Sequence, residues 1–477
     1  MAALSVSLTP FASPALYRLN YHLEDKLLTT RIILVRHGES SFNVERRVQG
    51  HGDKSTLTEA GQRSADQVGI ALSDLSFDAV YSSPLRRAKD TADRILSRLK
   101  TPPAASLQTT DRLKEINLTD WEGKLFSDIA EQDPEGYRNW QMRPHKLKMA
   151  APNTDGAIDY YPVPALFEQA EAFWRELLPR HAGQTVLLVA HSGINRALIC
   201  TAIGLSSDRY QSVHQSNCGI SVLNFAGGFG DAVQIESLNL TAHLGEPLPK
   251  PKSGQQGARF LLVRHGETDW NRQKRFQGHI DVPLNENGRA QSQRAAAFLK
   301  TIPIHHAVSS PMLRPKETAE VILQHHPDVP LELEANLKEI SHGLWEGKLE
   351  AEIEAGYPGT LHQWQRSPET VQMPEGENLQ QVWERTIAAW DQIVQTAASR
   401  SESGTTLVVA HDAVNKAILC YVLGLGPEHF WNFKQGNGAV SVIDYAATTD
   451  IQPVLMAMNI TVHLSDGILD QTAAGAL

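Results

Sequence analysis

The sequence is poor in cysteine, in long apolar runs and in positive charge, and each shortage excludes a class of protein. Three cysteines, Cys200, Cys218 and Cys420, occur in 477 residues, too few for a disulfide framework, and their spacing is not that of a zinc site. No apolar run approaches the length of a membrane span. The formal net charge is -10, so no global positive field gathers nucleic acid or an anionic membrane. We therefore expect a cytoplasmic protein with no nucleic-acid or membrane partner, whose anionic ligands are bound by local clusters of cations.

The sequence repeats itself once over nearly its whole length. The segment 31–39 matches the segment 259–267 at an offset of 228 residues, and His191 matches His411 at an offset of 220. A period this long is typical of a duplicated domain and not of a solenoid. Two similar modules in one chain can pack as a homodimer does, so pairing of the domains within the chain is one expected arrangement. The expected divisions are an N-terminal extension at 1–30, a first domain at 31–244, a linker at 245–258 and a second domain at 259–477.

Within each half, short β-branched runs alternate with amphipathic helical stretches. In the first half we expect strands at 32–35, 79–81 and 186–189, and helices at 59–72 and 85–99. This alternation, with strands apolar on both faces, predicts an α/β fold with helices on both sides of the sheet. The expected architecture is two tandem three-layer α/β/α domains, each with a mostly parallel central sheet. Ligands of such sheets bind beyond the carboxyl ends of the strands.

Two histidines in each half follow directly after a predicted buried strand. These are His37 and His191 in the first half, and His265 and His411 in the second. Since the carboxyl ends of parallel strands meet at one edge of a sheet, we expect the two histidines of each half to lie close together. A single histidine at a strand end is more often a satisfied structural residue. Two in each half, at matching positions, favour a role in chemistry.

Arginines stand near both histidine pairs. Arg36 and its counterpart Arg264 precede a His-Gly pair, where a guanidinium and a close backbone approach can bind an anion such as phosphate. Arg87 and Arg314 lie in the first turn of a predicted helix, where free N–H groups also favour anions. For Arg87 taken alone, an arginine on a solvated helix face is an equally good interpretation.

One glutamate in each half is a candidate proton donor. Glu115 and Glu339 each follow a Leu-Lys pair in a predicted loop. A carboxyl group beside a nucleophile can protonate a departing alkoxide and later accept a proton from water, provided that burial raises its pKa. Without the repeat, a glutamate in a surface loop would be the preferred interpretation.

The ordered set of these motifs resembles the histidine phosphatase (phosphoglycerate mutase-like) superfamily. The likeness covers nearly the whole chain apart from the first 30 residues and the linker. In the first half it is carried by Arg36-His37-Gly38-Glu39, Asn43, Leu57-Thr-Glu-Ala-Gly61, Ser83-Pro-Leu-x-Arg87, Glu115 and Ala190-His191-Ser-Gly193. In the second half it is carried by Arg264, His265, Asn271, Arg314, Glu339 and His411.

The resemblance implies a role for each of these residues. His37 and His265 would be the nucleophiles that become phosphohistidine, and Glu115 and Glu339 the proton donors. No metal ion or other cofactor is implied, because cationic side chains stabilise the transferring phosphoryl group. The implied partner is a small phosphorylated metabolite. The phosphate pocket would be formed by Arg36, Asn43, Arg87 and His191, and by Arg264, Asn271, Arg314 and His411.

The spacing of the motifs favours a phosphatase over a mutase. His37 and His191 are 154 residues apart, and His265 and His411 are 146 apart, whereas bisphosphoglycerate-dependent mutases resemble this pattern with a longer insertion. The expected activity is therefore metal-independent hydrolysis of a phosphomonoester through phosphohistidine. A phosphoglycerate mutase-type phosphotransferase is one alternative. The other is a chain with one catalytic domain and one regulatory domain that binds a phospho-ligand.

The two halves differ where substrate choice is decided. The second half carries Met373-Pro-Glu-Gly-Glu377 before a helix, a pattern similar to that of broad-specificity or small-sugar phosphatases of the family, and the first half lacks it. The first half instead resembles the two-domain 2-carboxy-D-arabinitol-1-phosphatases at Tyr161-Pro-Val163, so a sugar-acid phosphate such as 2-carboxy-D-arabinitol 1-phosphate is one expected substrate. Asp412 follows His411 where the first half has Ser192. If this carboxylate faces inward, it lowers the positive potential of the second pocket.

Overall fold

The computed structural model describes residues 29–151, 158–251, 257–400, 404–447, 451–465 and 467–472. The predicted N-terminal extension at 1–30 lies outside the described residues except for its last two, and Thr30 already begins the first strand. The predicted linker is described at 245–251 and 257–258. None of the helices in these ranges combines the length and the apolar character that a bilayer crossing requires.

Each half contributes six strands to the main sheet. Those of the first half are β1 (Thr30–Arg36), β2 (Ala79–Ser82), β3 (Gln108–Thr109), β6 (Thr185–Ala190), β7 (Ile220–Phe225) and β8 (Val233–Leu240). Those of the second half are β9 (Arg259–Arg264), β10 (His306–Ser309), β11 (Leu331–Leu333), β12 (Thr405–Ala410), β13 (Val440–Asp444) and β14 (Val454–Ile460). The strands expected at 32–35, 79–81 and 186–189 lie within β1, β2 and β6.

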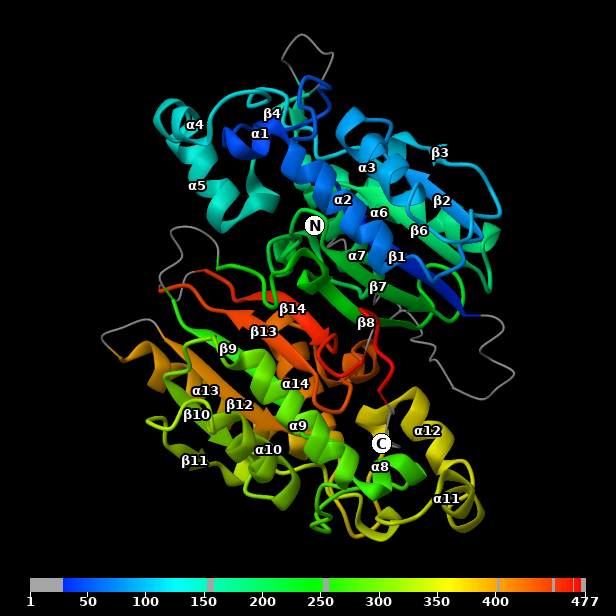
Figure 1. Cartoon of the computed structure of the whole chain (residues 1–477), viewed down its shortest axis with the longest axis vertical. Helices are drawn as coiled ribbons and strands as arrows, with labels where there is room; N and C mark the ends of the chain where they lie inside the picture. Colours follow the sequence, from blue (N-terminus) through cyan, green and yellow to red (C-terminus); the bar gives the residue numbers. More distant parts are fainter. Residues whose placement is uncertain are drawn as a thin grey trace, which may run out of the picture.

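The sheet of each half is mostly parallel, as expected. Four strands of each half are parallel neighbours, in the orders β3-β2-β6-β1 and β11-β10-β12-β9, and only the fifth strand, β7 or β13, runs opposite to the others. The expectation of two separate sheets is corrected: β8 pairs antiparallel with β14 at Leu238 and Met458, so the two halves share one twelve-stranded mixed sheet (Figure 1). Hydrophobic pattern alone did not indicate this pairing, because it shows that a strand is buried but not which strand covers it.

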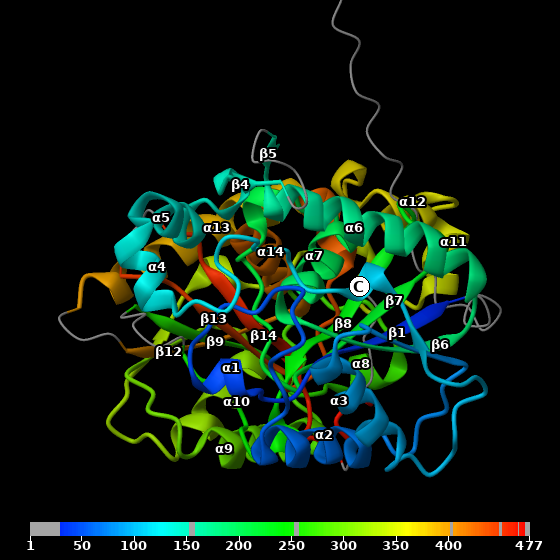
Figure 2. The ribbon, with the colours of Figure 1, turned by 90° about the horizontal axis from the view of Figure 1, so that it is seen from above.

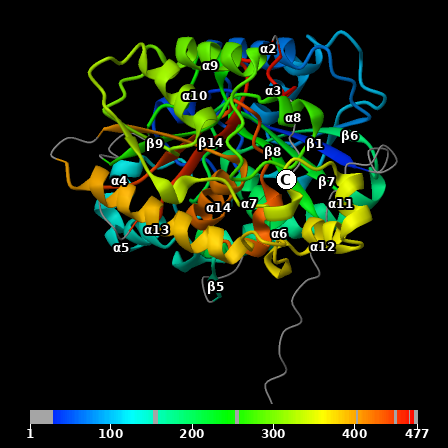
Figure 3. The same ribbon diagram turned by 90° about the horizontal axis from the view of Figure 1, so that it is seen from below.

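Helices cover both faces of this sheet. One face carries α2 (Glu59–Ala71), α3 (Arg86–Leu96), α9 (Glu286–Leu299) and α10 (Leu313–Leu323), and the other carries α6 (Pro162–Leu177), α7 (Ser192–Ala202), α13 (Leu379–Ala398) and α14 (Asp412–Leu423) (Figures 2 and 3). Alternate residues of β1 explain the layering: Ile32 and Leu34 join the core under α6 and α7, whereas Ile33 and Val35 join the core under α2 and α3. The expected helices at 59–72 and 85–99 correspond to α2 and α3.

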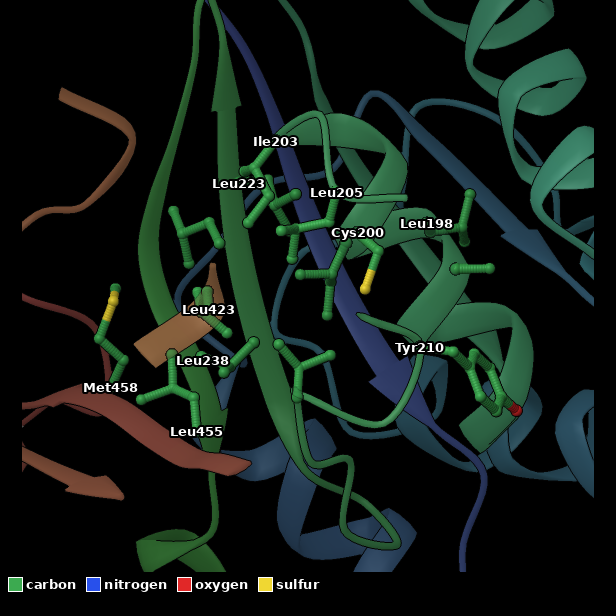
Figure 4. Close-up of a cluster of buried hydrophobic side chains, with 14 of the residues drawn as sticks. Leu198, Cys200, Ile203, Leu205, Tyr210, Leu223, Leu238, Leu423, Leu455 and Met458 are labelled. Carbon is green, nitrogen blue, oxygen red and sulfur yellow. The ribbon is translucent and has the colours of Figure 1, made fainter. Parts of the chain in front are cut away.

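The core between the halves is continuous. Leu238 of β8 packs in one cluster with Leu455 and Met458 of β14 and with Leu423 of α14, as the close-up shows (Figure 4). Every residue of β8 and of β14 is buried. The pairing of the two halves within the chain, one of the arrangements expected from the repeat, is therefore part of the fold.

Smaller elements lie above the carboxyl ends of the parallel strands. In the first half they are α1 (Ser41–Val44), α4 (Phe126–Gln132), α5 (Pro134–Met142), β4 (Met149–Ala150) and β5 (Asp159–Tyr160). In the second half they are α8 (Asp269–Gln273), α11 (Glu350–Gly356) and α12 (Thr360–Arg366). These elements differ more between the halves than the sheet does, and so the walls of the two sites differ.

Candidate active sites

The two histidines of each half lie together at the ends of neighbouring strands. β1 and β6 are adjacent and parallel, with Arg36 opposite Ala190, so His37 and His191 leave the sheet side by side. Their ring centroids are 5.1 Å apart. His265 and His411 follow β9 and β12 in the same way, with centroids 5.2 Å apart. All four rings are buried.

His37 and His265 are held in the form that a nucleophile needs. His37 Nδ1 lies 2.7 Å from the carbonyl oxygen of Gly38, and His265 Nδ1 lies 2.7 Å from that of Gly266. These contacts fit a tautomer in which Nδ1–H donates to the carbonyl and Nε2 carries the lone pair. Burial, and then the nearby arginines, hold the pKa of both rings well below the usual range of histidine. Both rings are therefore neutral at neutral pH.

The glycine of each Arg-His-Gly motif is required by a close approach of two backbones. A Cβ atom at Gly38 would lie 2.4 Å from the carbonyl oxygen of Gly61, and one at Gly266 would lie 2.4 Å from that of Gly288. The Gly38 N–H donates to Thr91 Oγ1 at 3.0 Å. This threonine, matched by a threonine in α10 of the second half, fixes the loop beside the nucleophile and was not identified from the sequence.

Buried arginines surround each nucleophile and are fixed by backbone carbonyls. Arg36 Nη1 donates to the Gln215 carbonyl at 2.8 Å, and Arg87 Nη2 donates to the Gly50 carbonyl at 3.1 Å. Arg264 and Arg314 repeat these contacts in the second half. Each of the four guanidiniums also has one buried N–H nitrogen without a partner among the described residues. Their charge and these donors are available to an oxyanion.

Burial lowers the pKa of Arg36 and of Arg314 to about 10, so both guanidiniums stay charged at neutral pH. His191 completes the first pocket, with both ring nitrogens unpartnered within the described part of the chain. In the second pocket, His411 Nε2 lies 2.9 Å from Ser310 Oγ. The arrangement can bind a phosphoryl group between two imidazoles and two guanidiniums.

Asn43 and Asn271 are connected to the loops around the nucleophiles. Asn43 Oδ1 accepts hydrogen bonds from Ser40 N at 3.1 Å and from Asn217 Nδ2 at 3.3 Å. Asn271 makes the matching contacts in the second half, including one from Asn437 Nδ2 at 3.3 Å. These contacts of the asparagines organise the loops, and a direct role in binding phosphate stays a prediction.

The candidate acids lie at the start of the helices that follow His191 and His411. Glu115 Oε2 accepts from Gly193 N at 3.1 Å, and Glu339 Oε1 accepts from Ala413 N at 3.2 Å. Burial raises the pKa of Glu339 to about 7, and the nearby Asp412 carboxylate adds to this increase. A carboxyl group with this pKa is partly protonated at neutral pH, as a proton donor must be.

The loop that carries the acid is held differently in the two halves. Arg385 of α13 donates to the Glu339 carbonyl at 2.9 Å and pairs with Glu377 at 2.8 Å. In the first half, Gln169 of α6 donates to the Lys114 carbonyl at 3.0 Å. An ion pair in one half is thus replaced by an uncharged side chain in the other.

Asp412 faces inward and pairs with two cations. Its carboxylate lies 3.5 Å from Arg264 Nη1 and 2.7 Å from Lys416 Nζ. Lys416, which lies four residues later on the same helix, forms an ion pair with this carboxylate, but the first half also carries a cation at the position of Lys416, so the expected loss of positive potential relative to the first pocket remains. In the first half, Ser192 and Arg196 occupy these two positions, and in the described ranges Arg196 forms no ion pair with a carboxylate. The first pocket keeps one formal positive charge more.

A second pair of differences accompanies this change. A Cβ atom at Gly193 would lie 2.3 Å from Glu115 Oε1 and 2.8 Å from the Tyr210 hydroxyl oxygen. The second half has Ala413 and Phe430 at these positions. The absence of the hydroxyl group at Phe430 removes one of the two close contacts that a methyl group would make, while the other, with the carboxylate of the acid, remains. The environment of the two acids therefore differs in shape as well as in charge.

Within the described residues, no group of three or more His, Cys, Asp or Glu side chains is placed to hold a metal ion. The site of each half is built from histidine, arginine and glutamate side chains at the rim of an α/β sheet. Together they define a phosphoryl-binding site with a nucleophile and an acid.

Sequence comparisons place the chain in a family. The model of the histidine phosphatase superfamily (branch 1) matches it twice, at residues 32–238 and 260–460. The chain therefore belongs to the histidine phosphatase superfamily and is a phosphatase of that superfamily, which implies a phosphorylated substrate.

The chain is similar to several named phosphatases. The chain is 30% identical over 454 residues to a 2-carboxy-D-arabinitol-1-phosphatase of Triticum aestivum, covering 91% of this chain and 86% of the relative. It is 32% identical over 218 residues to phosphoserine phosphatase 1 of Hydrogenobacter thermophilus, covering 45% of this chain and 95% of the relative. Among solved structures, the alpha-ribazole phosphatase of Shigella flexneri matches with a TM-score of 0.39 and 22% identity, over 45% of this chain and 99% of that one.

Proposed function

We propose that both halves hydrolyse phosphomonoesters of small metabolites, without a metal ion, through a phosphohistidine intermediate. The proposed catalytic units are residues 31–244 and 259–477, joined by the linker at 245–258. The observation that carries this proposal is the presence, in each half, of a neutral buried histidine beside arginines that each have one N–H nitrogen without a partner among the residues that the structure describes. Neither half lacks the nucleophile, an arginine or the acid, so we assign turnover to both.

The proposed reaction has two steps in each half. In the first half, His37 Nε2 attacks phosphorus, the bond to the ester oxygen breaks, and Glu115 donates its proton to the departing oxygen. Arg36, Arg87 and His191 stabilise the charge on the other phosphoryl oxygens. Water then attacks the phosphorus of phosphohistidine, one proton of the water passes to the Glu115 carboxylate, the bond between His37 Nε2 and phosphorus breaks, and inorganic phosphate leaves. His265 and Glu339 act in the same way in the second half.

For the first site we propose a substrate with a second anionic group, such as 2-carboxy-D-arabinitol 1-phosphate. The name of the Triticum aestivum relative supports this choice. The unbalanced charge of Arg196 supports it as well, because an extra cation beside the pocket favours a carboxylate in addition to the phosphate. At the second site the Asp412 carboxylate opposes such a group.

The intermediate can be detected directly. The protein is mixed with phosphomonoesters labelled in the phosphoryl group, without added metal, and quenched within milliseconds into alkaline detergent, in which phosphohistidine survives. The panel contains carboxyarabinitol phosphate, phosphoserine, phosphoglycerates and sugar phosphates. We expect label on His37 and His265, located by peptide mapping, and release of inorganic phosphate. Binding without label would instead indicate a module that holds phospho-ligands.

The second site is expected to lose activity as the pH rises through about 7. Glu339 must be protonated to donate, and its pKa is raised to about 7 by burial and by Asp412. Its proton is present below this pH and lost above it. In a His37→Ala background, which isolates the second site, Asp412→Asn should move the fall of kcat/KM to lower pH, because a charge that disfavours ionised Glu339 is gone. Glu384→Gln, which removes an exposed carboxylate from α13, is the control. An unchanged profile in Asp412→Asn would contradict the assignment of Glu339.

A further inference from the structure

Each nucleophile and its arginine are supported by a loop that precedes an antiparallel strand. We call residues 212–218 the site-1 loop and residues 432–438 the site-2 loop. In the first half, Arg36 Nη1 donates to the Gln215 carbonyl at 2.8 Å, and Asn217 Nδ2 donates to the His37 carbonyl at 2.9 Å. A displacement of the loop would therefore displace both the guanidinium and the nucleophile. The corresponding residues of the second half are Arg264, Gln435, Asn437 and His265.

Both loops rest on a strand of the opposite half. Leu455 N of β14 donates to the Ser212 carbonyl at 2.8 Å, and His214 N donates to the Leu455 carbonyl at 2.9 Å. In the mirror arrangement, Lys434 N donates to the Ile235 carbonyl of β8 at 3.0 Å. The site-1 loop is thus bonded to the second half of the chain, and the site-2 loop is bonded to the first half.

Asn239 of β8 ties the site-1 loop to the second half. Its Oδ1 accepts from Ser216 N, in the loop, at 2.7 Å, and its Nδ2 donates to the Met456 carbonyl of β14 at 2.7 Å. The residue is fully buried and has a φ of 52°. Asparagine tolerates this left-handed conformation better than most residues. One amide group therefore spans from the interface to the loop that orients Arg36 and His37.

Asn459 of β14 makes the mirror connection. Its Oδ1 accepts from Gly436 N of the site-2 loop at 2.7 Å, and its Nδ2 donates to the Glu236 carbonyl of β8 at 2.7 Å. It is also fully buried, with a φ of 55°. The amide donates in addition to Asp470 at 3.1 Å. The same device thus occurs twice, once for each site.

We propose that Asn239 and Asn459 are positioning residues. Through their hydrogen bonds, each half of the chain sets the geometry of the phosphate pocket in the opposite half. The inference rests on the proposed function and adds a dependence of each site on the opposite half. Asn239 acts on site 1 through the strand β14, and Asn459 acts on site 2 through the strand β8. Neither asparagine contacts the reacting atoms.

The test removes the connection to the opposite half and keeps the connection to the loop. Asn239→Asp retains an oxygen that accepts from Ser216 N, but it replaces the donor that faces the Met456 carbonyl with an acceptor. Asn459→Asp removes the donor that faces the Glu236 carbonyl at the other site, and it also removes the donor to Asp470 Oδ2, so Asn459→Gly, which adds no second carboxylate there, is the cleaner test of this site. Each change is made in a His265→Ala background, which reports site 1, and in a His37→Ala background, which reports site 2. Asn239→Gly and Asn459→Gly, which suit the positive φ, are second variants in case the aspartates fail to fold.

The proposal expects a crossed pattern. Asn239→Asp should lower kcat at site 1 by about tenfold or more, because small misplacements of reacting groups cost rate, and should leave site 2 within about twofold. Asn459→Asp should show the reverse. Backbone hydrogen exchange should become faster only in the site-1 loop for Asn239→Asp, and only in the site-2 loop for Asn459→Asp. Ser237→Ala, which removes another bond between the halves, from Ser237 Oγ to the Asn459 carbonyl at 3.5 Å, should change neither kcat.

Two results would overturn the proposal. In one, both sites lose activity equally along with thermal stability, as a purely structural interface residue would cause. In the other, a loop exchanges faster while its site keeps its kcat. Failure of the proposed function is recognised separately, because the parent variant His265→Ala or His37→Ala would itself show no turnover. If only one of these parents is inactive, the asparagine of the site that remains active tests the inference.

Discussion

Replacing both His37 and His265 by alanine is expected to abolish phosphomonoester turnover, with kcat reduced at least about 10⁴-fold, as for removal of other catalytic nucleophiles. Each single replacement should remove the activity of one site and leave the other. The reason is the geometry of the two imidazoles. In each, Nδ1 contacts a backbone carbonyl, so Nε2 is left to face the buried arginines of the pocket. Turnover of the substrate panel by the three variants provides the measurement.

The histidine variants also separate the proposal from its alternatives. If only one half is catalytic and the other regulates, one single variant loses all turnover and the other keeps all of it. Label trapped on the protein should disappear in parallel with turnover. Thermal unfolding close to that of the parent shows that the buried rings were removed without loss of the fold. Full residual turnover in the double variant would be incompatible with a phosphohistidine mechanism at these residues.

Replacing the acid is expected to discriminate between leaving groups. Glu339→Gln in a His37→Ala background should lower kcat/KM for an alkyl phosphate by roughly 10²- to 10⁴-fold, the usual contribution of general acid catalysis. The loss should be much smaller for an aryl phosphate whose phenolate leaves without a proton. Glu115→Gln in a His265→Ala background should behave alike at the first site.

The glutamate test has a matched control and a clear contradiction. Glu332→Gln makes the same chemical change on β11, where the side chain is exposed, and should leave both substrates unaffected. Equal losses for the alkyl and the aryl phosphate in Glu339→Gln would mean that the carboxyl group holds the pocket in shape and does not donate a proton. The hydrogen bond from Ala413 N to Glu339 is the contact through which the carboxyl group would hold the pocket in shape.

The sequence predicted the parts of the site that follow from strand order. Because β1 and β6 are parallel neighbours, residues directly after them had to meet, and His37 and His191 do so. The ion pair between Asp412 and Lys416 was missed, although its signal was present: Lys416 follows at the i,i+4 spacing that allows ion pairs on a helix.

Contacts between residues far apart in the chain could not be predicted in this way. The donation from Gly38 N to Thr91 joins two residues 53 positions apart, and no local pattern distinguishes this threonine from others in amphipathic helices. The junction of β8 with β14 is a stronger example. Neither strand was among those expected from the sequence, and β8 carries polar residues such as Gln234 and Glu236 at alternate positions. Even with both strands recognised, many pairings would remain possible, and only the folded chain selects one.

The shared sheet also limits how this tandem arrangement can diverge. A chain that lost either half would uncover the edge of a strand whose residues are all buried in the intact protein, and an unpaired strand edge of this kind favours aggregation. Loss of one half is therefore expected to destabilise the remaining half, which disfavours deletion of one module from the duplicated gene. The two catalytic centres differ instead in the elements above the sheet and in single residues around the pockets, and the exchange of a serine for an aspartate after the second histidine is a change of the second kind.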